Sequence, residues 1–325
     1  KSVPEISNLS PRFQICPRDF KSVPEKRTAM TICRISGVIQ SSLDKQNGFM
    51  SRCFPMNATY PIGIFDSGVG GLSVLREIRR ELANEDLLYV ADSACVPYGD
   101  KSPQFVEARS VAITEFLVGR NAKAIVVACN TATGAAIMTL RSRFSVPIVG
   151  IEPAVKPAVG KTESGVVAVL ATNGTLSSDK FANLLARFGA GVDVLIQPCA
   201  GLVEQVETGE FYSDGARALI AKYVLPLLER GADTIILGCT HYTFLTPLIR
   251  DIAGPAISIV DPNAAIAHEL RRRLECNNMI SPDARPGKER FWTSGSPDDV
   301  KPVISQLWNE DVDVRRLPKR YCRST

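Results

Sequence analysis

Two cysteines stand in nearly the same local sequence, Ala128-Cys129-Asn130-Thr131 and Gly238-Cys239-Thr240-His241, about 110 residues apart. Each follows a short apolar run typical of a buried strand and precedes the start of a helical pattern. Unpaired backbone N–H groups at a helix N-terminus favour an anion, so the sequence predicts that both sulfurs are stabilised as thiolates. Ligands of parallel α/β sheets bind at the carboxyl ends of the strands. We therefore expect one site with a reactive thiol from each half of the chain.

Short polar side chains accompany both cysteines. Ser67, Asn130, Thr131 and Thr240 each stand where a helix is expected to begin, and capping that helix is the ordinary role of such a residue taken alone. Together, their hydroxyl, amide and backbone N–H groups could bind the carboxylates of a ligand. Asp66, at the end of an expected strand, would repel a phosphate but could accept a proton or orient an ammonium group.

His241 is one of two histidines in the chain and could act as a general acid/base or pair with a carboxylate. A zinc site is disfavoured because the other histidine, His268, lies far along the chain, so no metal is expected. A Cys-His-Asn protease has no use for two equivalent cysteines. The glycines of residues 66–71 lack the GxGxxG spacing and the Lys-Ser/Thr pair of nucleotide loops. The structural alternative for either cysteine is a small buried hydrophobic residue.

The elements that must position these residues form an α/β pattern, because from Tyr60 onward short apolar strands alternate with amphipathic helices. The first set has expected strands at 61–65, 87–91, 124–128 and 148–151, with helices ending near 82 and at 105–119 and 131–144. The second has strands at 165–171, 193–197 and 234–237, with helices at 178–188 and 214–230. The two cysteines close the third strand of each set, which indicates an internal repeat.

Composition limits the function further. The chain has 325 residues, is 45% hydrophobic and contains no apolar run long enough to cross a bilayer. Nine cysteines without a CxxC pair favour free thiols in a reducing compartment, which suggests the cytoplasm. The net charge is +4, but residues 1–59 hold 9 Lys/Arg against 4 Asp/Glu, or +5, so the remainder is at −1. A nearly neutral body argues against nucleic acid as the main partner.

Residues 1–59 show no hydrophobic period and repeat the string Lys-Ser-Val-Pro-Glu, so we expect an irregular basic extension. The segment has acidic residues and no apolar core, so it fits neither a transit peptide nor a secretory signal. Because Met56 stands just before the first strong strand, the alternative is translated sequence upstream of the functional protein. Residues 317–325 form a short basic tail.

Several motifs resemble those of bacterial glutamate racemases, in the aspartate/glutamate racemase family. They begin with residues 65–71 and Pro97-Tyr98-Gly99, continue with the two cysteine junctions, and end with Asp261-Pro262 and residues 291–295. The resemblance runs in motif order from about residue 61 to about 316. One departure is Ala94-Cys95-Val96, before Pro97, where many members have a different, often basic, residue, which affects the expected geometry of that loop but not the chemistry.

The resemblance implies roles for specific residues. Asp66 and His241 would assist their nearest cysteines, Glu207 matches a further acid of the family, and Asp92 matches another. The implied catalytic residues are Cys129, Cys239, Asp66, His241 and Glu207. The implied substrate-binding residues are Asp66, Ser67, Pro97, Tyr98, Gly99, Asn130, Thr131, Thr240 and His241.

The resemblance also implies two similar α/β domains with mostly parallel sheets, related by pseudo-symmetry, and an active site in the cleft between them. The expected domains are 60–153 plus 262–316, and 154–261. The implied activity is glutamate racemisation by two cysteines without a cofactor, supplying D-glutamate for peptidoglycan. L- and D-glutamate would be the substrates, a homodimer the assembly, and a cell-wall precursor nucleotide an activator.

The nearest rival is a racemase for aspartate or another amino acid on the same fold, which typically carries an acid where His241 stands. A regulatory protein on this scaffold would be expected to lack one of the two cysteines. A thiol redox protein would form a reversible disulfide.

Overall fold

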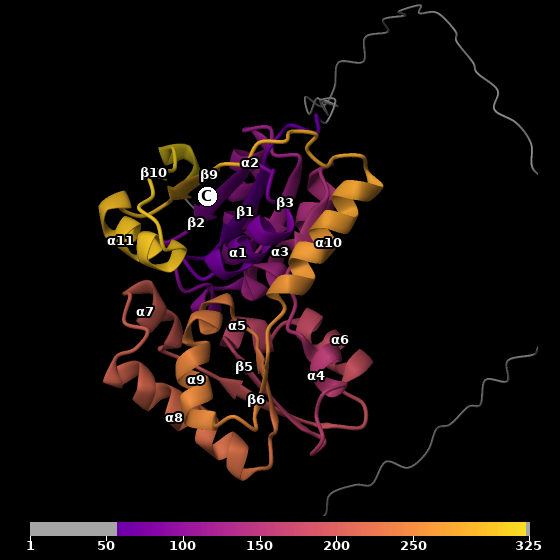
Figure 1. Cartoon of the computed structure of the whole chain (residues 1–325), viewed down its shortest axis with the longest axis vertical. Helices are drawn as coiled ribbons and strands as arrows, with labels where there is room; N and C mark the ends of the chain where they lie inside the picture. The colour runs from indigo at the N-terminus through magenta and orange to yellow at the C-terminus, as the bar shows by residue number, and fades with distance from the viewer. Residues whose placement is uncertain (1–56, 323–325) are drawn as a thin grey trace, which may run out of the picture. The chain divides into compact units, whose positions relative to one another are not determined.

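Two parallel sheets organise the described part of the chain, residues 57–322, in the computed structural model (Figure 1). Every strand pairing among these residues is parallel. This confirms the expected α/β class. The predicted extension falls almost entirely outside the described residues, at 1–56, as does the end of the basic tail at 323–325.

The larger sheet has six strands in the order β10-β9-β2-β1-β3-β4. Its strands are apolar because helices cover both faces, so successive side chains such as Ile64 and Phe65 enter different core clusters. The strands are β1 (Ile62–Asp66), β2 (Leu87–Ala91), β3 (Ala124–Val127), β4 (Ile148–Gly150), β9 (Glu289–Thr293) and β10 (Val314–Arg316).

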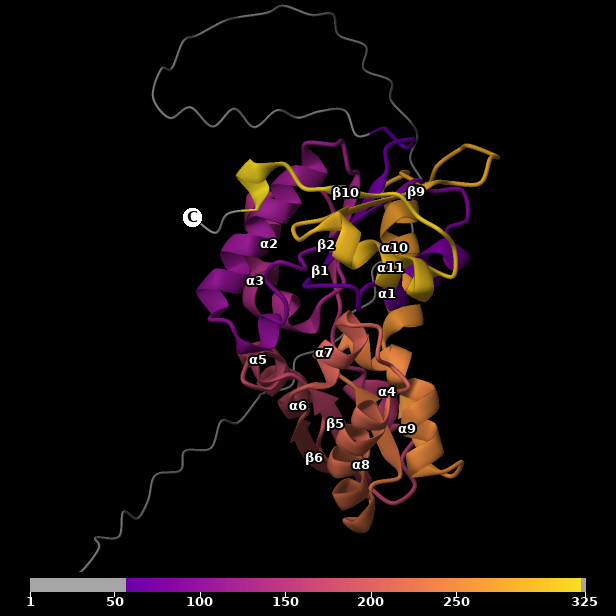
Figure 2. The same cartoon turned by 90° about the vertical axis from the view of Figure 1, so that its left-hand side faces the viewer.

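Figure 2 shows α2 (Pro103–Val118) and α3 (Asn130–Arg143) on one side of these strands and α1 (Leu72–Glu81) and α10 (Asn263–Cys276) on the other. α11 (Pro297–Trp308) packs into the same core cluster as α1 and α10. The local sequence sets where these helices begin. For example, Ser102 caps α2 by accepting a hydrogen bond from the backbone N–H of Phe105, and Pro103 occupies the first turn.

The smaller sheet has four strands in the order β6-β5-β7-β8, which repeats the order β2-β1-β3-β4 of the larger one. Its strands are β5 (Val166–Ala171), β6 (Asp193–Pro198), β7 (Thr234–Leu237) and β8 (Ser258–Val260). Its helices are α4 (Val155–Val159), α6 (Asp179–Phe188), α8 (Asp214–Glu229) and α9 (Thr246–Ala253). The internal repeat expected from the sequence is therefore present in the strand order.

Short helices follow several strand ends and lie where the two sheets with their helices meet, as Figures 1 and 2 show for α5 and α7. They are η1 (Tyr98–Asp100), α5 (Asn173–Leu176), α7 (Leu202–Glu207) and η2 (Thr240–Leu245); η3 (Lys319–Tyr321) follows β10. The two cysteine junctions differ here. Cys129 leads directly into the long helix α3, whereas Cys239 leads into the 3₁₀ helix η2, which continues as α9.

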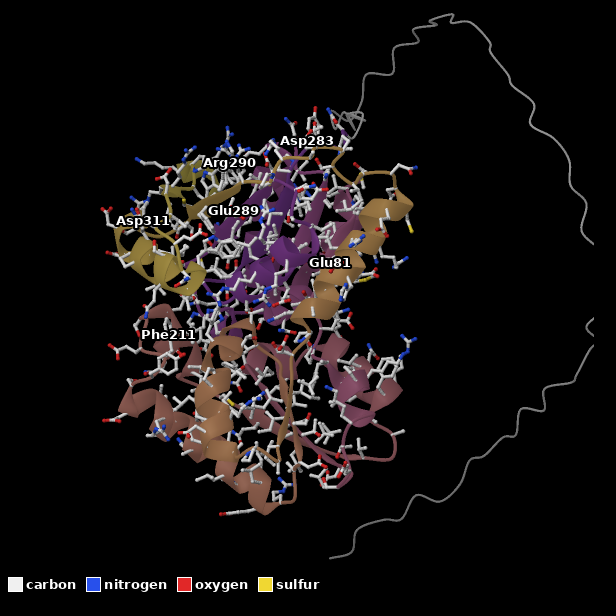
Figure 3. All side chains as sticks on the ribbon, viewed as in Figure 1. Glu81, Phe211, Asp283, Glu289, Arg290 and Asp311 are labelled. Carbon is white, nitrogen blue, oxygen red and sulfur yellow. The ribbon has the colours of Figure 1, made fainter. Side chains whose placement is uncertain are left out.

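The chain returns to the six-stranded sheet after β8. Glu81 of α1 pairs with Arg271 of α10 at 3.1 Å, and Glu289 of β9 pairs with Arg79 of α1 at 2.5 Å. Figure 3 labels the two glutamates. Residues 262–316 therefore complete the first sheet and 154–261 hold the second. One core cluster runs through both sheets, so the domain boundaries themselves stay a prediction. Between residues 57 and 322, each helix is too short or too polar to cross a membrane.

Candidate active site

A small cavity lies at the carboxyl ends of β1, β3, β5 and β7 and contains both cysteines in its wall. Its volume is about 10 Å³, which is room for roughly one water molecule. The part of the chain that carries the larger sheet contributes Ser67, Pro97, Tyr98, Gly99, Cys129, Asn130 and Thr131. The part that carries the smaller sheet contributes Thr172, Thr175, Val203, Gly238, Cys239, Thr240 and His241.

The cavity brings together every residue implied for substrate binding except Asp66, which lies behind the wall with Glu207 and contacts the wall residues from there. Four wall residues were not expected from the sequence. Thr172 and Gly238 follow strands, so the strand-end argument used for Cys129 could have found them. Thr175 and Val203 lie on the short helices α5 and α7, for which the sequence showed no clear pattern.

Cys129 is the N-cap residue of α3, and its side chain is 6% exposed. Its sulfur accepts a hydrogen bond from the backbone N–H of Ala132 at 3.5 Å and lies 3.9 Å from Oγ of Ser67. Burial nevertheless raises the pKa of the Cys129 thiol, and the charge of Asp66 raises it further. The N–H group at the start of α3 lowers this pKa, as expected, but desolvation outweighs it, so the expectation of a stabilised thiolate is wrong at this cysteine.

Cys239 has a different environment. Its side chain is 8% exposed, and it makes no capping hydrogen bond to η2. Instead, its sulfur lies 3.7 Å from Nδ1 of His241. The neighbour of this sulfur is therefore an imidazole ring rather than a helix N-terminus.

His241 bridges Cys239 and Glu207, since its Nε2 lies 2.6 Å from Oε1 of Glu207. The same carboxylate oxygen accepts the backbone N–H of Val69 at 2.7 Å. We assign a proton to Nε2, which donates to Glu207, so the backbone N–H of Gly70 at 3.3 Å is only a neighbour of that nitrogen. Burial opposes a charge on the ring, but hydrogen bonds to Cys239 and Glu207 raise the pKa of His241 well above its ordinary value.

The glycines of residues 66–71 have a clear purpose in this arrangement. A Cβ atom at Gly68 would lie 1.8 Å from Oε1 of Glu207, and one at Gly70 would lie 2.2 Å from Nδ1 of His241. Only glycine lets these two side chains approach the loop so closely. The loop therefore accommodates an imidazole and a carboxylate where a nucleotide loop would bind a phosphate.

Asp66 is fully buried at the end of β1. Its carboxylate accepts the backbone N–H groups of Gly68 and Gly71 at 3.3 and 3.0 Å and the hydroxyl of Thr240 at 3.4 Å. Burial raises the pKa of Asp66, although the nearby His241 opposes this effect. Asp66 thus connects the loop after β1 with the residue that follows Cys239.

Two features of the wall point to a ligand. Both side-chain amide atoms of Asn130 are buried without a hydrogen-bond partner, and such groups in a native protein call for an explanation. The hydroxyls of Thr131, Thr172 and Thr175 bind one another at 2.8 to 3.1 Å, and that of Thr172 also accepts the backbone N–H of Thr175 at 3.4 Å. These amide and hydroxyl groups are the kind that bind carboxylates. Among residues 57–322, no group of three or more Cys, His, Asp or Glu side chains is arranged to hold a metal ion.

Comparison with known proteins agrees with this geometry. A family model for Asp/Glu/hydantoin racemases matches residues 62–270. The glutamate racemase of Methylococcus capsulatus is 53% identical over 262 residues, which cover 81% of this chain and 97% of the relative. The structure of isoform RacE1 of glutamate racemase from Bacillus anthracis superposes with a TM-score of 0.74 at 31% identity, over 81% of this chain and 99% of the other.

A further solved structure is that of Escherichia coli glutamate racemase in complex with L-glutamate and the activator UDP-MurNAc-Ala. It matches with a TM-score of 0.70 at 32% identity and covers 79% of this chain and 98% of the other. These similarities extend over both sheets and both cysteine junctions. The chain belongs to the Asp/Glu/hydantoin racemase family.

Proposed function

We propose that this protein interconverts L- and D-glutamate, with Cys129 and Cys239 as the two acid/base groups. The observation that carries the proposal is that both sulfurs, one from each half of an internal repeat, border the same cavity. Inverting an α-carbon requires a group that removes a proton from one face and a group that returns one to the other face. The identity of 53% to a glutamate racemase supports glutamate as the substrate.

The two cysteines have different environments. Burial favours the thiol of Cys129, while the sulfur of Cys239 lies 3.7 Å from Nδ1 of His241. With L-glutamate, the Cys239 thiolate would accept the α-proton and the Cys129 thiol would donate its proton to the opposite face. Afterwards Cys239 is the thiol and Cys129 the thiolate, which is the starting state for D-glutamate. No net proton is gained or lost.

The negative charge that develops on the substrate must be stabilised by groups already in place. Asn130 and the three threonine hydroxyls offer donors for the substrate carboxylates, and Asp66 and Glu207 are set back where they can hold His241. Glutamate is far larger than the water-sized cavity, so the cavity must open for substrate and close around it.

Wider roles follow from the same proposal. D-glutamate would be supplied to peptidoglycan synthesis in the cytoplasm, and the enzyme would work as a homodimer. The Escherichia coli relative, solved with UDP-MurNAc-Ala as activator, supports a cell-wall precursor nucleotide as a regulator of this chain as well.

The test is circular dichroism of the purified full chain with L-glutamate, D-glutamate or L-aspartate, in the presence of a chelator and with no added cofactor. We expect the signal of either glutamate enantiomer to decay to zero and the aspartate signal to persist. Decay with aspartate alone would favour the rival racemase. A stable signal with all three substrates would refute the racemase proposal.

A further inference from the structure

A second charged group lies beside the cavity but outside its wall. Arg109 lies on α2, is 0% exposed, and forms two hydrogen bonds with the carboxylate of Asp92, from Nε at 2.9 Å and from Nη2 at 2.7 Å. Asp92 follows β2 directly and is also fully buried. Burial opposes the charge on Arg109, but the hydrogen bonds and charge of Asp92 raise the pKa of the guanidinium. Since arginine keeps its charge even in water, the guanidinium of Arg109 stays charged across the working pH range.

The ion pair is connected to the cavity through one phenol. The hydroxyl of Tyr98 donates to Oδ2 of Asp92 at 2.5 Å, so it points away from the cavity that the rest of Tyr98 lines. The next residue, Gly99, lies against Thr172 of the opposite wall, where an added Cβ would come within 2.6 Å of the threonine Cβ. The position of this wall is therefore set by Asp92, and the position of Asp92 by Arg109.

We infer that Arg109 is a positioning residue for racemisation, which acts through Asp92 and Tyr98 to fix the Tyr98–Gly99 wall of the cavity. This inference rests on the proposed racemase activity. Tyr98 is close enough to Cys129 for the two to interact electrostatically. Burial raises the pKa of the Tyr98 phenol most, Asp92 raises it further, and a negative charge on Cys129 also raises it. A displaced wall would therefore change how substrate is held beside that cysteine.

The chemistry of the pair explains why arginine is needed. A buried carboxylate without a partner costs several kcal/mol, and the guanidinium fork matches both carboxylate oxygens at once. Cys95 also lies beside Asp92, and burial together with that carboxylate raises the pKa of its thiol to about 11, so Cys95 stays neutral and does not balance the charge of Asp92. The positive charge that balances Asp92 comes from Arg109 on α2.

The test compares two variants that each break a fully buried ion pair on the six-stranded sheet. Arg109→Met breaks the pair at the carboxyl ends of the strands, next to the cavity. Lys123→Met breaks the pair of Lys123 with Glu85, 2.5 Å apart, which lies where β2 and β3 begin, at the opposite end of the sheet. Both variants should unfold at a lower temperature, so the second controls for lost stability.

We expect Arg109→Met to raise KM and lower kcat/KM about 100-fold, the effect of a misplacement of about 1 Å, while Lys123→Met leaves KM unchanged. A purely structural role would reduce the amount of folded enzyme and hence the apparent kcat, but not KM. Arg109→Lys should restore part of the loss, because the charge returns without the fork. The inference is wrong if KM is the same in Arg109→Met and Lys123→Met.

Tyr98→Phe covers the case in which Arg109→Met does not fold, because it removes only the phenol hydroxyl and leaves the ion pair intact. It should raise KM as well, and an unchanged KM would show that the ion pair does not act through Tyr98. Turnover by the unmodified chain separates the two levels of the argument. If that chain does not racemise glutamate, the proposed function fails. If it does, and Arg109→Met and Lys123→Met have the same KM, only the role of Arg109 fails.

Discussion

Cys129 and Cys239 occupy corresponding places in an internal repeat but have unlike neighbours. Burial and Asp66 favour a thiol at Cys129, whereas the imidazole of His241 lies beside the sulfur of Cys239. The repeat therefore supplies two equivalent positions, and the side chains around them make the two positions chemically different. Because enantiomers have equal free energies in water, kcat/KM must nevertheless be equal in the two directions for the enzyme and for every variant.

The first prediction concerns these sulfurs. Cys129→Ala and Cys239→Ala should each lower kcat/KM for both enantiomers by about 100- to 10,000-fold, because each removes one of the two groups that must transfer a proton. Cys276→Ser, at an exposed position on α10, is the control and should be fully active. The measurement is the decay of circular dichroism of L- and D-glutamate. Normal turnover in either alanine variant would contradict the two-cysteine mechanism.

The second prediction concerns the charge of His241. Its hydrogen bond to Glu207 helps to raise the pKa of the ring, so Glu207→Gln should lower that pKa. When the pKa of the ring is lowered, the ring loses its proton at a lower pH. The alkaline fall in kcat/KM should therefore begin at a lower pH in the variant than in the unmodified enzyme.

Glu204→Gln is the matched control for this pH profile, since Glu204 lies on the same helix, α7, but is exposed. It should leave the profile unchanged. An identical alkaline fall in Glu207→Gln and in Glu204→Gln would mean that the carboxylate of Glu207 does not control the charge of the ring.

Most residues of the cavity wall could be predicted because they follow strands directly in the sequence. Parallel strands bring their carboxyl ends to one edge of the sheet, whatever the sequence between them. The same reasoning could not find Arg109, whose only sequence feature is a charge in the middle of a helix and whose importance comes from total burial against Asp92. It also overestimated how far the helix N-terminus lowers the pKa of Cys129. Burial opposes that effect, and the depth of burial is known only once the chain is folded.

Among the elements, η1 and α5 form the contact that closes the cavity. A Cβ atom at Gly174 of α5 would lie 2.8 Å from Cγ2 of Thr131, 3.2 Å from the carbonyl oxygen of Gly99 and 3.3 Å from its Cα. Outside this contact is a larger polar groove of about 740 Å³, which Gly99, Thr131 and Gly174 also line. The contact therefore involves residues that line both the catalytic cavity and this groove.

The third prediction is that Gly174→Ala weakens this closure. Overpacking of this kind typically costs about 1–3 kcal/mol. Here the added methyl group would destabilise the closed form of the cavity, so kcat/KM should fall about tenfold or more. Gly215→Ala is the control, because Gly215 on α8 has only ordinary contacts, at 3.6 Å, and should remain fully active. Equal kcat/KM for the two alanine variants would exclude a closing role for this contact.

Between residues 61 and 237 the long elements could be predicted from the sequence to within about two residues, because buried strands and amphipathic helices leave regular patterns. No bounds were predicted for the long helices α10 and α11. The short elements could not be predicted. α5 spans Asn173–Leu176 and α7 spans Leu202–Glu207, which is too few residues to show a helical period. The edge strand β10 was likewise missed, since Val314–Arg316 is short and partly exposed. These short elements depend on contacts between the two sheets and their helices.

At the scale of the whole molecule, the described chain begins at the end of the larger sheet that lies opposite the cavity. The ammonium group of Lys123, just before β3, binds the carbonyl oxygen of Ala58 at 2.5 Å, close to the start of β1. The cavity lies at the other ends of these strands. Ala58 therefore lies at the end of the sheet that is far from the two cysteines.

The last prediction is that a chain starting at Met56 folds and racemises glutamate with the kcat/KM of the full chain. All described residues of the cavity and its supports lie between Asp66 and His241. The removed residues hold the whole +5 of residues 1–59, a charge that would suit an anionic cell-wall nucleotide, so both chains should be assayed with and without UDP-MurNAc-Ala. Loss of basal activity on truncation would make the segment part of the fold. Loss of nucleotide activation alone would assign it to regulation.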